Sequence, residues 1–156
     1  MSRRKQIEMT DAEARAFLDG SRTVILNSIG RDGVPHPMPM WFAVEDDGAV
    51  VMTTFAKSQK IRNLERDPRV SLLAEDGEAY AELRGVVIYG KAELSPGVDQ
   101  VLDVLERVTR RSTGAAGAAP EALRAGLEKT ARKRVAIRVR PERIVSWDHR
   151  KLGGVY

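Results

Sequence analysis

The chain has 156 residues, of which 42% are hydrophobic and 31% are charged, so it fits a single globular domain over residues 1–156 and is not a disordered polypeptide. The absence of cysteine and the presence of only 2 histidines exclude a disulfide framework and a catalytic thiol, and they predict no metal site. The formal net charge of +4 would suit a polyanion, but no nucleic-acid motif accompanies it, so each basic cluster is interpreted as a solvated face.

Short strands separated by turns are predicted in the first part of the chain. Thr10 and Glu13 fit a capping box at the start of a short helix. Strands are expected at residues 22–29, 34–44, 49–55, 69–75 and 79–94, with a helix at 58–66 and a bend at Gly85. Because Pro35, Pro37 and Pro39 lack a backbone N–H, the second strand must lie at a sheet edge or contain a bulge.

The last third of the chain is expected to hold two helices and a final strand. Apolar spacing predicts one helix from about residue 96 and another over 120–133, joined by a loop of small residues. Residues 134–148 alternate like strands, with Pro141 at a turn or bulge. The chain is thus predicted to be mainly β (α+β), a small barrel of six to seven mostly antiparallel strands with flanking helices.

The stretch "SQKIRNLERDPRV", residues 58–70, carries the strongest functional signal. A helix N-terminus exposes unpaired backbone N–H groups and a partial positive charge, which favour a bound anion. Ser58, Gln59 and Lys60 would add a hydroxyl, an amide and an ammonium at that point. The alternative from the residues alone is a capped surface helix with a solvated lysine. Ile61 and Leu64, three apart, are predicted to be core residues.

The order "DGVPHPMPMWF", "VVMTTF", "SQKIRNLERDPRVSLL" and "LRGVVIYGKAEL" resembles the pyridoxamine 5'-phosphate oxidase-like, flavin-binding split β-barrel family over residues 10–148. Within that family, the chain is most similar to the branch that uses the deazaflavin coenzyme F420 rather than FMN. FMN-using relatives commonly carry an additional arginine on the second strand, and "HPMPMWF" has none. Arg138 and Arg140 are expected to face the carboxylate tail of F420 from one side of a strand.

The resemblance also implies where a coenzyme would lie. Its phosphate would be held by Ser58, Gln59 and Lys60, with Asn63 supporting the turn. Its ring would lie along the second and third strands, whose implied contacts are His36, Pro37, Met38, Pro39, Met40, Trp41, Thr53 and Thr54. Barrel packing is the alternative for the methionines and Trp41, and exposure to solvent is the alternative for His36. Trp147 with Lys151 or Arg150 would cover the partner subunit's site, unless Trp147 and Leu152 only close the barrel.

The implied function is an F420-dependent oxidoreductase that transfers a hydride between the deazaflavin and a small organic substrate. The resemblance implies a homodimer, and no catalytic residue, nucleic-acid partner or membrane partner is predicted. No apolar run is long enough to span a membrane, and the N-terminus lacks the apolar segment of a signal peptide, so a cytoplasmic location is expected. The alternatives are an FMN-dependent relative, a flavin-binding protein without turnover, and a basic barrel associated with nucleic acid.

Overall fold

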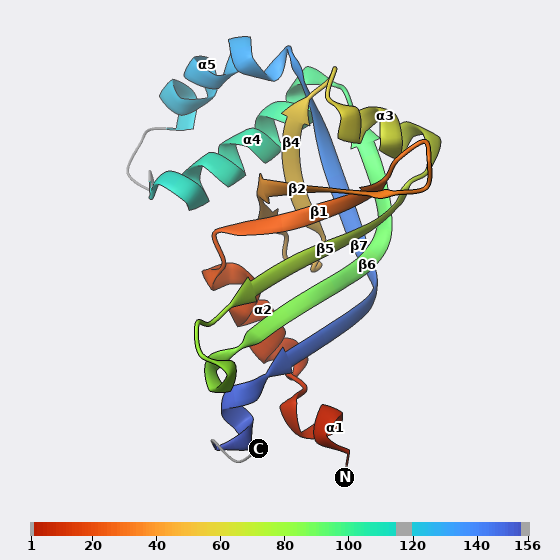
Figure 1. Ribbon diagram of the computed structural model, residues 1–156. Coiled ribbons are helices and arrows are strands. Elements are labelled where there is room, and N and C mark those ends of the chain that lie inside the picture. Colours follow the sequence, from red (N-terminus) through yellow and green to blue (C-terminus); the bar gives the residue numbers. More distant parts are fainter. Residues whose placement is uncertain (1, 115–119, 154–156) are drawn as a thin grey trace.

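Seven antiparallel strands form one strongly curved sheet in the computed structural model, which describes residues 2–114 and 120–153 (Figure 1). The strand order is β2-β1-β5-β6-β7-β4-β3. The strands are β1 (Thr23–Ile29), β2 (Pro35–Trp41), β3 (Ala43–Val44), β4 (Val50–Phe55), β5 (Arg69–Asp76), β6 (Arg84–Ser95) and β7 (Arg134–Asp148). The predicted mainly β split barrel is therefore confirmed.

Five α-helices and two 3-10 helices accompany the sheet. They are α1 (Arg3–Ile7), α2 (Asp11–Gly20), α3 (Gln59–Arg66), α4 (Val98–Thr113), α5 (Pro120–Ala131), η1 (Tyr80–Glu82) and η2 (His149–Leu152). The capping box predicted for the second of these is present, because Thr10 and Glu13 each accept a hydrogen bond from the other's backbone N–H. Within the described part of the chain, no helix combines the length and the hydropathy needed to cross a lipid bilayer.

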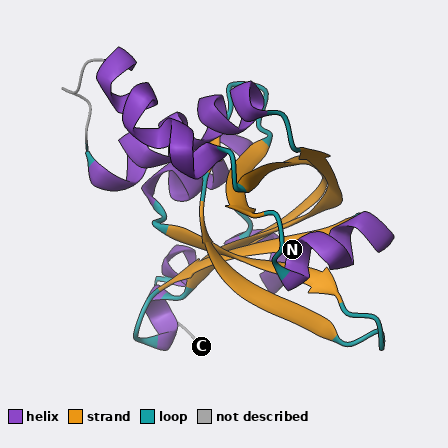
Figure 2. Cartoon of the chain, turned by 90° about the horizontal axis from the view of Figure 1, so that it is seen from above, coloured by secondary structure: helices purple, strands orange, loops and turns teal. Residues whose placement is uncertain are grey.

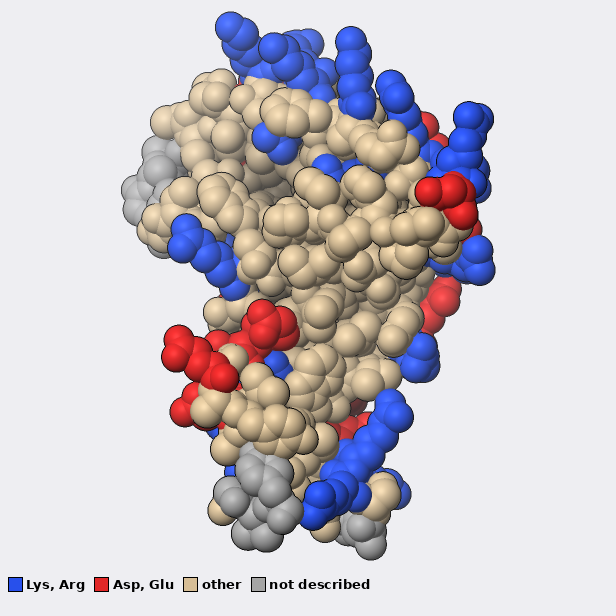
Figure 3. Space-filling view, in the orientation of Figure 1, with Lys and Arg blue, Asp and Glu red and all other residues tan. Residues whose placement is uncertain are grey.

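The two faces of the sheet are covered differently. The main core lies on the inner face, where Leu26, Leu72 and Ile88 pack with residues of α2 and α3. On the outer face, α4 and α5 cover β4 and β7 through contacts such as Val101 with Ala136, and Figure 2 shows these helices gathered on one side of the curved strands. Among the helices of the described residues, none covers the outer face of β1, β5 and β6, and the central surface in Figure 3 shows no charged side chains.

Arg111 joins three parts of the molecule from α4. Its guanidinium lies over the Phe42 ring, with 4.1 Å from Cζ to the ring centroid, and burial lowers its pKa. It donates hydrogen bonds to the backbone carbonyls of Leu18, Asp19, Ser21 and Phe42. Because these include carbonyls at the C-terminus of α2, one cation satisfies groups that the helix itself leaves unpaired.

The strands differ from the expected ones at two places and agree with them at a third. The strand expected over residues 34–44 is two strands, because Phe42 separates β2 from β3. The bend expected at Gly85 is wrong: the register shift lies at Tyr89/Gly90, where Gly90 pairs with Pro141. Pro141 thus sits at a bulge, as predicted. Gly85 is needed for another reason, since a Cβ there would lie 2.3 Å from Cζ2 of Trp147.

Candidate functional site

The helix α3 starts where the sequence predicts and presents its first turn beside the end of β4. Ile61 and Leu64 are both 2% exposed and anchor the helix on the core, which confirms their predicted role. Ser58 is the N-cap residue, but its side chain makes no capping hydrogen bond to the helix. Its hydroxyl lies 3.5 Å from Thr54 Oγ1 and is half-buried. The first turn therefore keeps unpaired N–H groups and a hydroxyl that a ligand can reach.

Lys60 is a buried cation without a carboxylate. Its side chain belongs to a residue that is only 8% exposed, and Nζ donates a 2.9 Å hydrogen bond to Thr54 Oγ1. Among residues 2–114 and 120–153, no Asp or Glu forms an ion pair with it. Burial lowers the pKa of Lys60, and the charge of Arg134 lowers it further. An ammonium held in this way gains most from an anionic ligand.

Asn63 fixes α3 against the sheet. It is fully buried, its Nδ2 donates to Ser28 Oγ on β1 at 3.0 Å, and its Oδ1 accepts from Gln59 Nε2 at 2.9 Å. The structure thus places Asn63 where the predicted support of the turn requires it. Gln59 is exposed at the helix start, and its amide is oriented by this bond.

Arg134, the first residue of β7, is a part of this site that sequence reasoning missed. Its Nη1 lies 3.3 Å from Thr53 Oγ1, and its Cζ lies 4.5 Å from the centroid of the Phe55 ring. Its buried Nε has no hydrogen-bond partner, and burial lowers its pKa. The only signal in the sequence was its place in a basic cluster, and pairing of β7 with β4 brings it beside Phe55.

His36 lies beside α3. The sequence left open whether it contacts the coenzyme or faces solvent. It lines a groove of about 460 Å³ together with Pro35, Gln59 and Asn63, between α3 and the turn that joins β1 to β2. Its Nδ1 is buried and has no hydrogen-bond partner. His36 is thus turned toward the helix start instead of being free in solvent, and its Nδ1 can take a bond from a ligand or give one to it.

Along Pro35 to Pro39 the free edge of β2 offers acceptors only, and Trp41 adds one backbone N–H at its end. β2 lies at the end of the sheet and pairs with β1 alone. A proline cannot donate to a ladder, so Pro35, Pro37 and Pro39 must occupy the positions whose backbone groups point away from β1. Their carbonyls face the free edge without accompanying N–H groups. A ligand that lies along Pro35 to Pro39 therefore meets backbone carbonyls and no backbone N–H group.

The other residues expected along the ring are divided between core and surface. Met40 is buried in the main core, whereas Met38 is 36% exposed and Trp41 is 52% exposed. Thr53 and Thr54 are buried and bond the two cations of the site, Arg134 and Lys60. Packing is thus the role of Met40, while Trp41 stays available to a ligand or a partner.

The C-terminal residues of the same chain lie far from α3. β7 runs from the end beside α5 to the opposite end of the molecule, near the C-terminus (Figure 1). Trp147 is the next-to-last residue of β7, and η2 follows it in the chain. Trp147 crosses Gly85, and because Ser146 and Asp148 are buried, it points to the uncovered outer face. Lys151 Nζ bonds Glu13 Oε2 and the carbonyl of Glu8. Within the chain Lys151 therefore connects the C-terminal residues to Glu8 and Glu13 and has a structural role. Residues 154–156 lie outside the described residues.

The expected role of Arg138 and Arg140 is not supported by their contacts. Arg138 forms ion pairs with Glu45 at 2.8 Å and Asp47 at 2.5 Å. Arg140 is exposed and lies near Asp47 and Glu93. Because carboxylates already neutralise both guanidinium groups, they are poor partners for the tail of a coenzyme. The cations left for that role are those near α3.

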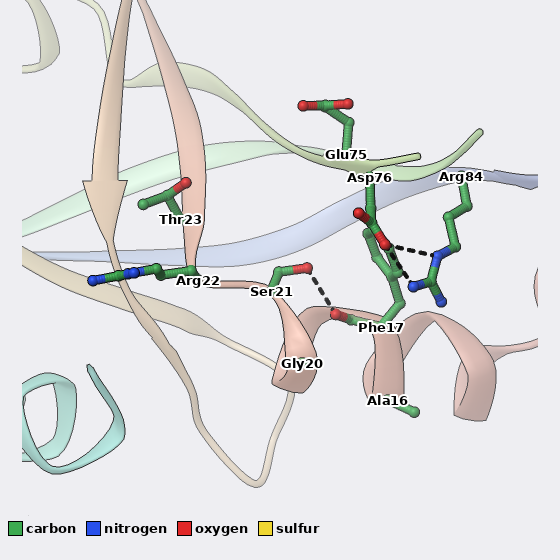
Figure 4. A pocket seen from close by; sticks show the side chains of 9 residues that line it. All are labelled: Ala16, Phe17, Gly20, Ser21, Arg22, Thr23, Glu75, Asp76 and Arg84. Carbon is green, nitrogen blue, oxygen red and sulfur yellow. Dashed lines mark hydrogen bonds and ion pairs between the residues drawn. The ribbon is translucent and has the colours of Figure 1, made fainter. Parts of the chain in front are cut away.

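A separate pocket of about 360 Å³ lies between α2 and the β5–β6 hairpin (Figure 4). Asp76 and Arg84 form an ion pair at its wall, and Arg84 also lies over the Phe17 ring. No residue of the α3 site lines it. Across the two described ranges of the chain, no group of three or more His, Cys, Asp or Glu residues is placed to hold a metal ion. The α3 site is therefore the stronger candidate.

Comparison with known proteins shows the family of the chain and its similarity to solved structures. Residues 10–148 match the family model described as pyridoxamine 5'-phosphate oxidase. A solved conserved hypothetical protein from Mycobacterium tuberculosis is 42% identical, with a TM-score of 0.88 over 100% of this chain and 95% of that one. A solved F420 reductase is 25% identical, with a TM-score of 0.62 over 83% of this chain and 94% of that one.

A curated relative matches a shorter part of the chain. The 5a,11a-dehydrotetracycline/5a,11a-dehydrooxytetracycline reductase of Streptomyces rimosus is 29% identical over 76 residues, which are 46% of this chain and 54% of the reductase. The chain thus spans about half the length of this relative.

Proposed function

Since the chain belongs to the pyridoxamine 5'-phosphate oxidase family, we propose that it is an oxidoreductase that binds a deazaflavin coenzyme of the F420 type and acts on a small organic molecule. Similarity to an F420 reductase and to a tetracycline-type reductase supports this reading. The observation that carries it is Lys60, a buried ammonium without a carboxylate at the start of α3. A phosphate is the group that this arrangement fits best.

The residues around α3 fit such a coenzyme. The N–H groups of the first turn, the Ser58 hydroxyl and the Lys60 ammonium would hold the phosphate. The carbonyls along the free edge of β2 would accept from an N–H of the ring, and Trp41 would cover its apolar surface. When bound, the coenzyme supplies the hydride chemistry. The protein positions it, excludes water and sets the charge around it.

We place the second copy of a homodimer on the uncovered outer face of β1, β5 and β6. This face exposes Tyr89, which is 37% exposed, and leaves Ile25, Leu73 and Val87 partly buried in the single chain. Trp147 lies on the same face. In such a dimer the partner's Trp147 would cover the coenzyme held at α3. This supports a site that is complete only when two chains meet.

The experiment that tests the function is a titration of the purified protein with F420, FMN and haem, followed by fluorescence and absorbance. Binding of F420 in preference to the other two supports the proposal. FMN is the second candidate, because the phosphate site around Lys60 suits either coenzyme. Preference for FMN would assign an FMN-dependent enzyme or a flavin-binding protein, and turnover with the reduced coenzyme would separate these two. Binding of haem alone would overturn the proposal.

A further inference from the structure

Arg134 differs from Arg138 and Arg140, two other arginines of β7, in lacking an ion pair, and it differs from Arg143 in having a buried Nε without a partner. Arg138 and Arg140 meet carboxylates, whereas no ion pair joins Arg134 to any Asp or Glu in the described ranges. Its Nη1 bonds Thr53 weakly, at 3.3 Å to Oγ1 and 3.5 Å to the carbonyl. Its Nε is buried without a partner. A half-buried guanidinium with a buried donor that has no partner is less favourable than one whose donors are all bonded, and an anionic ligand nearby would stabilise it.

Phe55 holds the Arg134 side chain in place. The guanidinium carbon lies 4.5 Å from the centroid of the Phe55 ring, within the range of a cation–π contact. Phe55 itself is 55% exposed, so the ring does not serve the core. The contact with the ring restricts the guanidinium, and a guanidinium held in this way loses less freedom when it bonds an oxyanion.

Arg134 and Lys60 both lie at the end of β4 that precedes α3. Arg134 bonds Thr53 and Lys60 bonds Thr54, whose side chains leave the strand on opposite faces. The link between Arg134 and α3 is Phe55, whose carbonyl accepts the N–H of Ser58 at 3.0 Å. The positive charge of Arg134 also lowers the pKa of Lys60, after the larger effect of burial. Neighbouring cations that lack a carboxylate are stabilised by an anion that binds beside them.

We propose that Arg134, held on the Phe55 ring, is a second ligand of the coenzyme phosphate and makes the site select coenzymes that carry a phosphate over those that lack it. This inference rests on the proposed function, because it assigns a residue to the same phosphate site. It adds a specificity-determining residue from the far end of the sequence.

The test compares ligands that carry a phosphate with ligands that lack it; FMN and riboflavin differ in the phosphate alone, whereas F420 also carries a tail that its chromophore lacks. FMN and riboflavin form one pair, and F420 and its phosphate-free deazaflavin chromophore form the other. Each is titrated by fluorescence into the wild type, Arg134→Gln and the control Arg62→Gln, an exposed arginine of α3. Arg134→Gln should lower the affinity for the phosphate-bearing ligand about 10- to 100-fold and leave the affinity for the phosphate-free ligand unchanged. Arg62→Gln should change neither by more than about 2-fold.

An unchanged preference for phosphate in Arg134→Gln would overturn the inference, and so would an equal loss for both ligands, which indicates packing. If Arg134→Gln fails to fold, Arg134→Lys and Phe55→Leu test the same point through the shape and orientation of the cation. If the wild type binds none of the four ligands, the proposed function fails, and titration with inorganic pyrophosphate followed by NMR still tests Arg134. Saturable shifts that Arg134→Gln abolishes support the residue's role, and equal shifts in both proteins refute it.

Discussion

Replacing Lys60 with methionine should separate ligand binding from stability. The substitution removes the ammonium but keeps an unbranched side chain of similar length in a position that is 8% exposed. A charge-assisted hydrogen bond to phosphate contributes about 1.5–3 kcal/mol, so the dissociation constant of a phosphate-bearing coenzyme should rise about 10- to 150-fold. Lys60 lies at the helix start, and it is the one buried lysine among the described residues.

The same change should not destabilise the free protein. In the absence of a ligand, the Lys60 charge is desolvated, repelled by Arg134 and compensated by one hydroxyl, Thr54 Oγ1. Removing that charge should therefore stabilise the fold by on the order of 1 kcal/mol, which corresponds to a rise of about 2–4 °C in Tm for a chain of this size.

Thermal unfolding without ligand and a fluorescence titration with F420 and FMN measure the two effects on the same samples. Arg62→Met is the matched control, because Arg62 is an exposed cation on the same helix and should leave both quantities nearly unchanged. A Lys60→Met protein that loses affinity and also unfolds several degrees lower would refute the reasoning, since Lys60 would then be a structural residue.

Three further outcomes follow from the contacts. Burial and Arg134 lower the pKa of Lys60. The affinity for a phosphate-bearing coenzyme should therefore be full while Lys60 is protonated and should fall as the pH rises through a pKa below that of a free lysine. The affinity of Lys60→Met should not show this fall with pH. Arg111→Met should lower the free energy of unfolding by about 2–4 kcal/mol in denaturant titrations, since it leaves several carbonyls unpaired, and a loss below about 0.5 kcal/mol would contradict the assigned role. Gly85→Ala should displace the Trp147 ring and shift its fluorescence, and unchanged emission would refute the contact. The variant should bind the coenzyme more weakly only if the partner's Trp147 covers the site.

The sequence alone determined the features that depend on neighbouring residues. The helix at 58–66 followed from a short polar residue, apolar spacing and a terminating Asp-Pro pair, and its start was correct. The edge position of β2 followed from three prolines, because a missing N–H is a local property. The burial of Ile61 and Leu64 followed from helical periodicity for the same reason.

Only the tertiary structure decided which charges are free. Arg134 meets Thr53 across 81 positions of sequence, and Arg138 meets Glu45 across 93, so neither contact could be read from spacing. The pairing of β7 with β4 brings the first arginine beside Phe55, and ion pairs with Glu45 and Asp47 neutralise the second. Register between distant strands controls both outcomes, because a slip of one residue would send each side chain to the other face of the sheet.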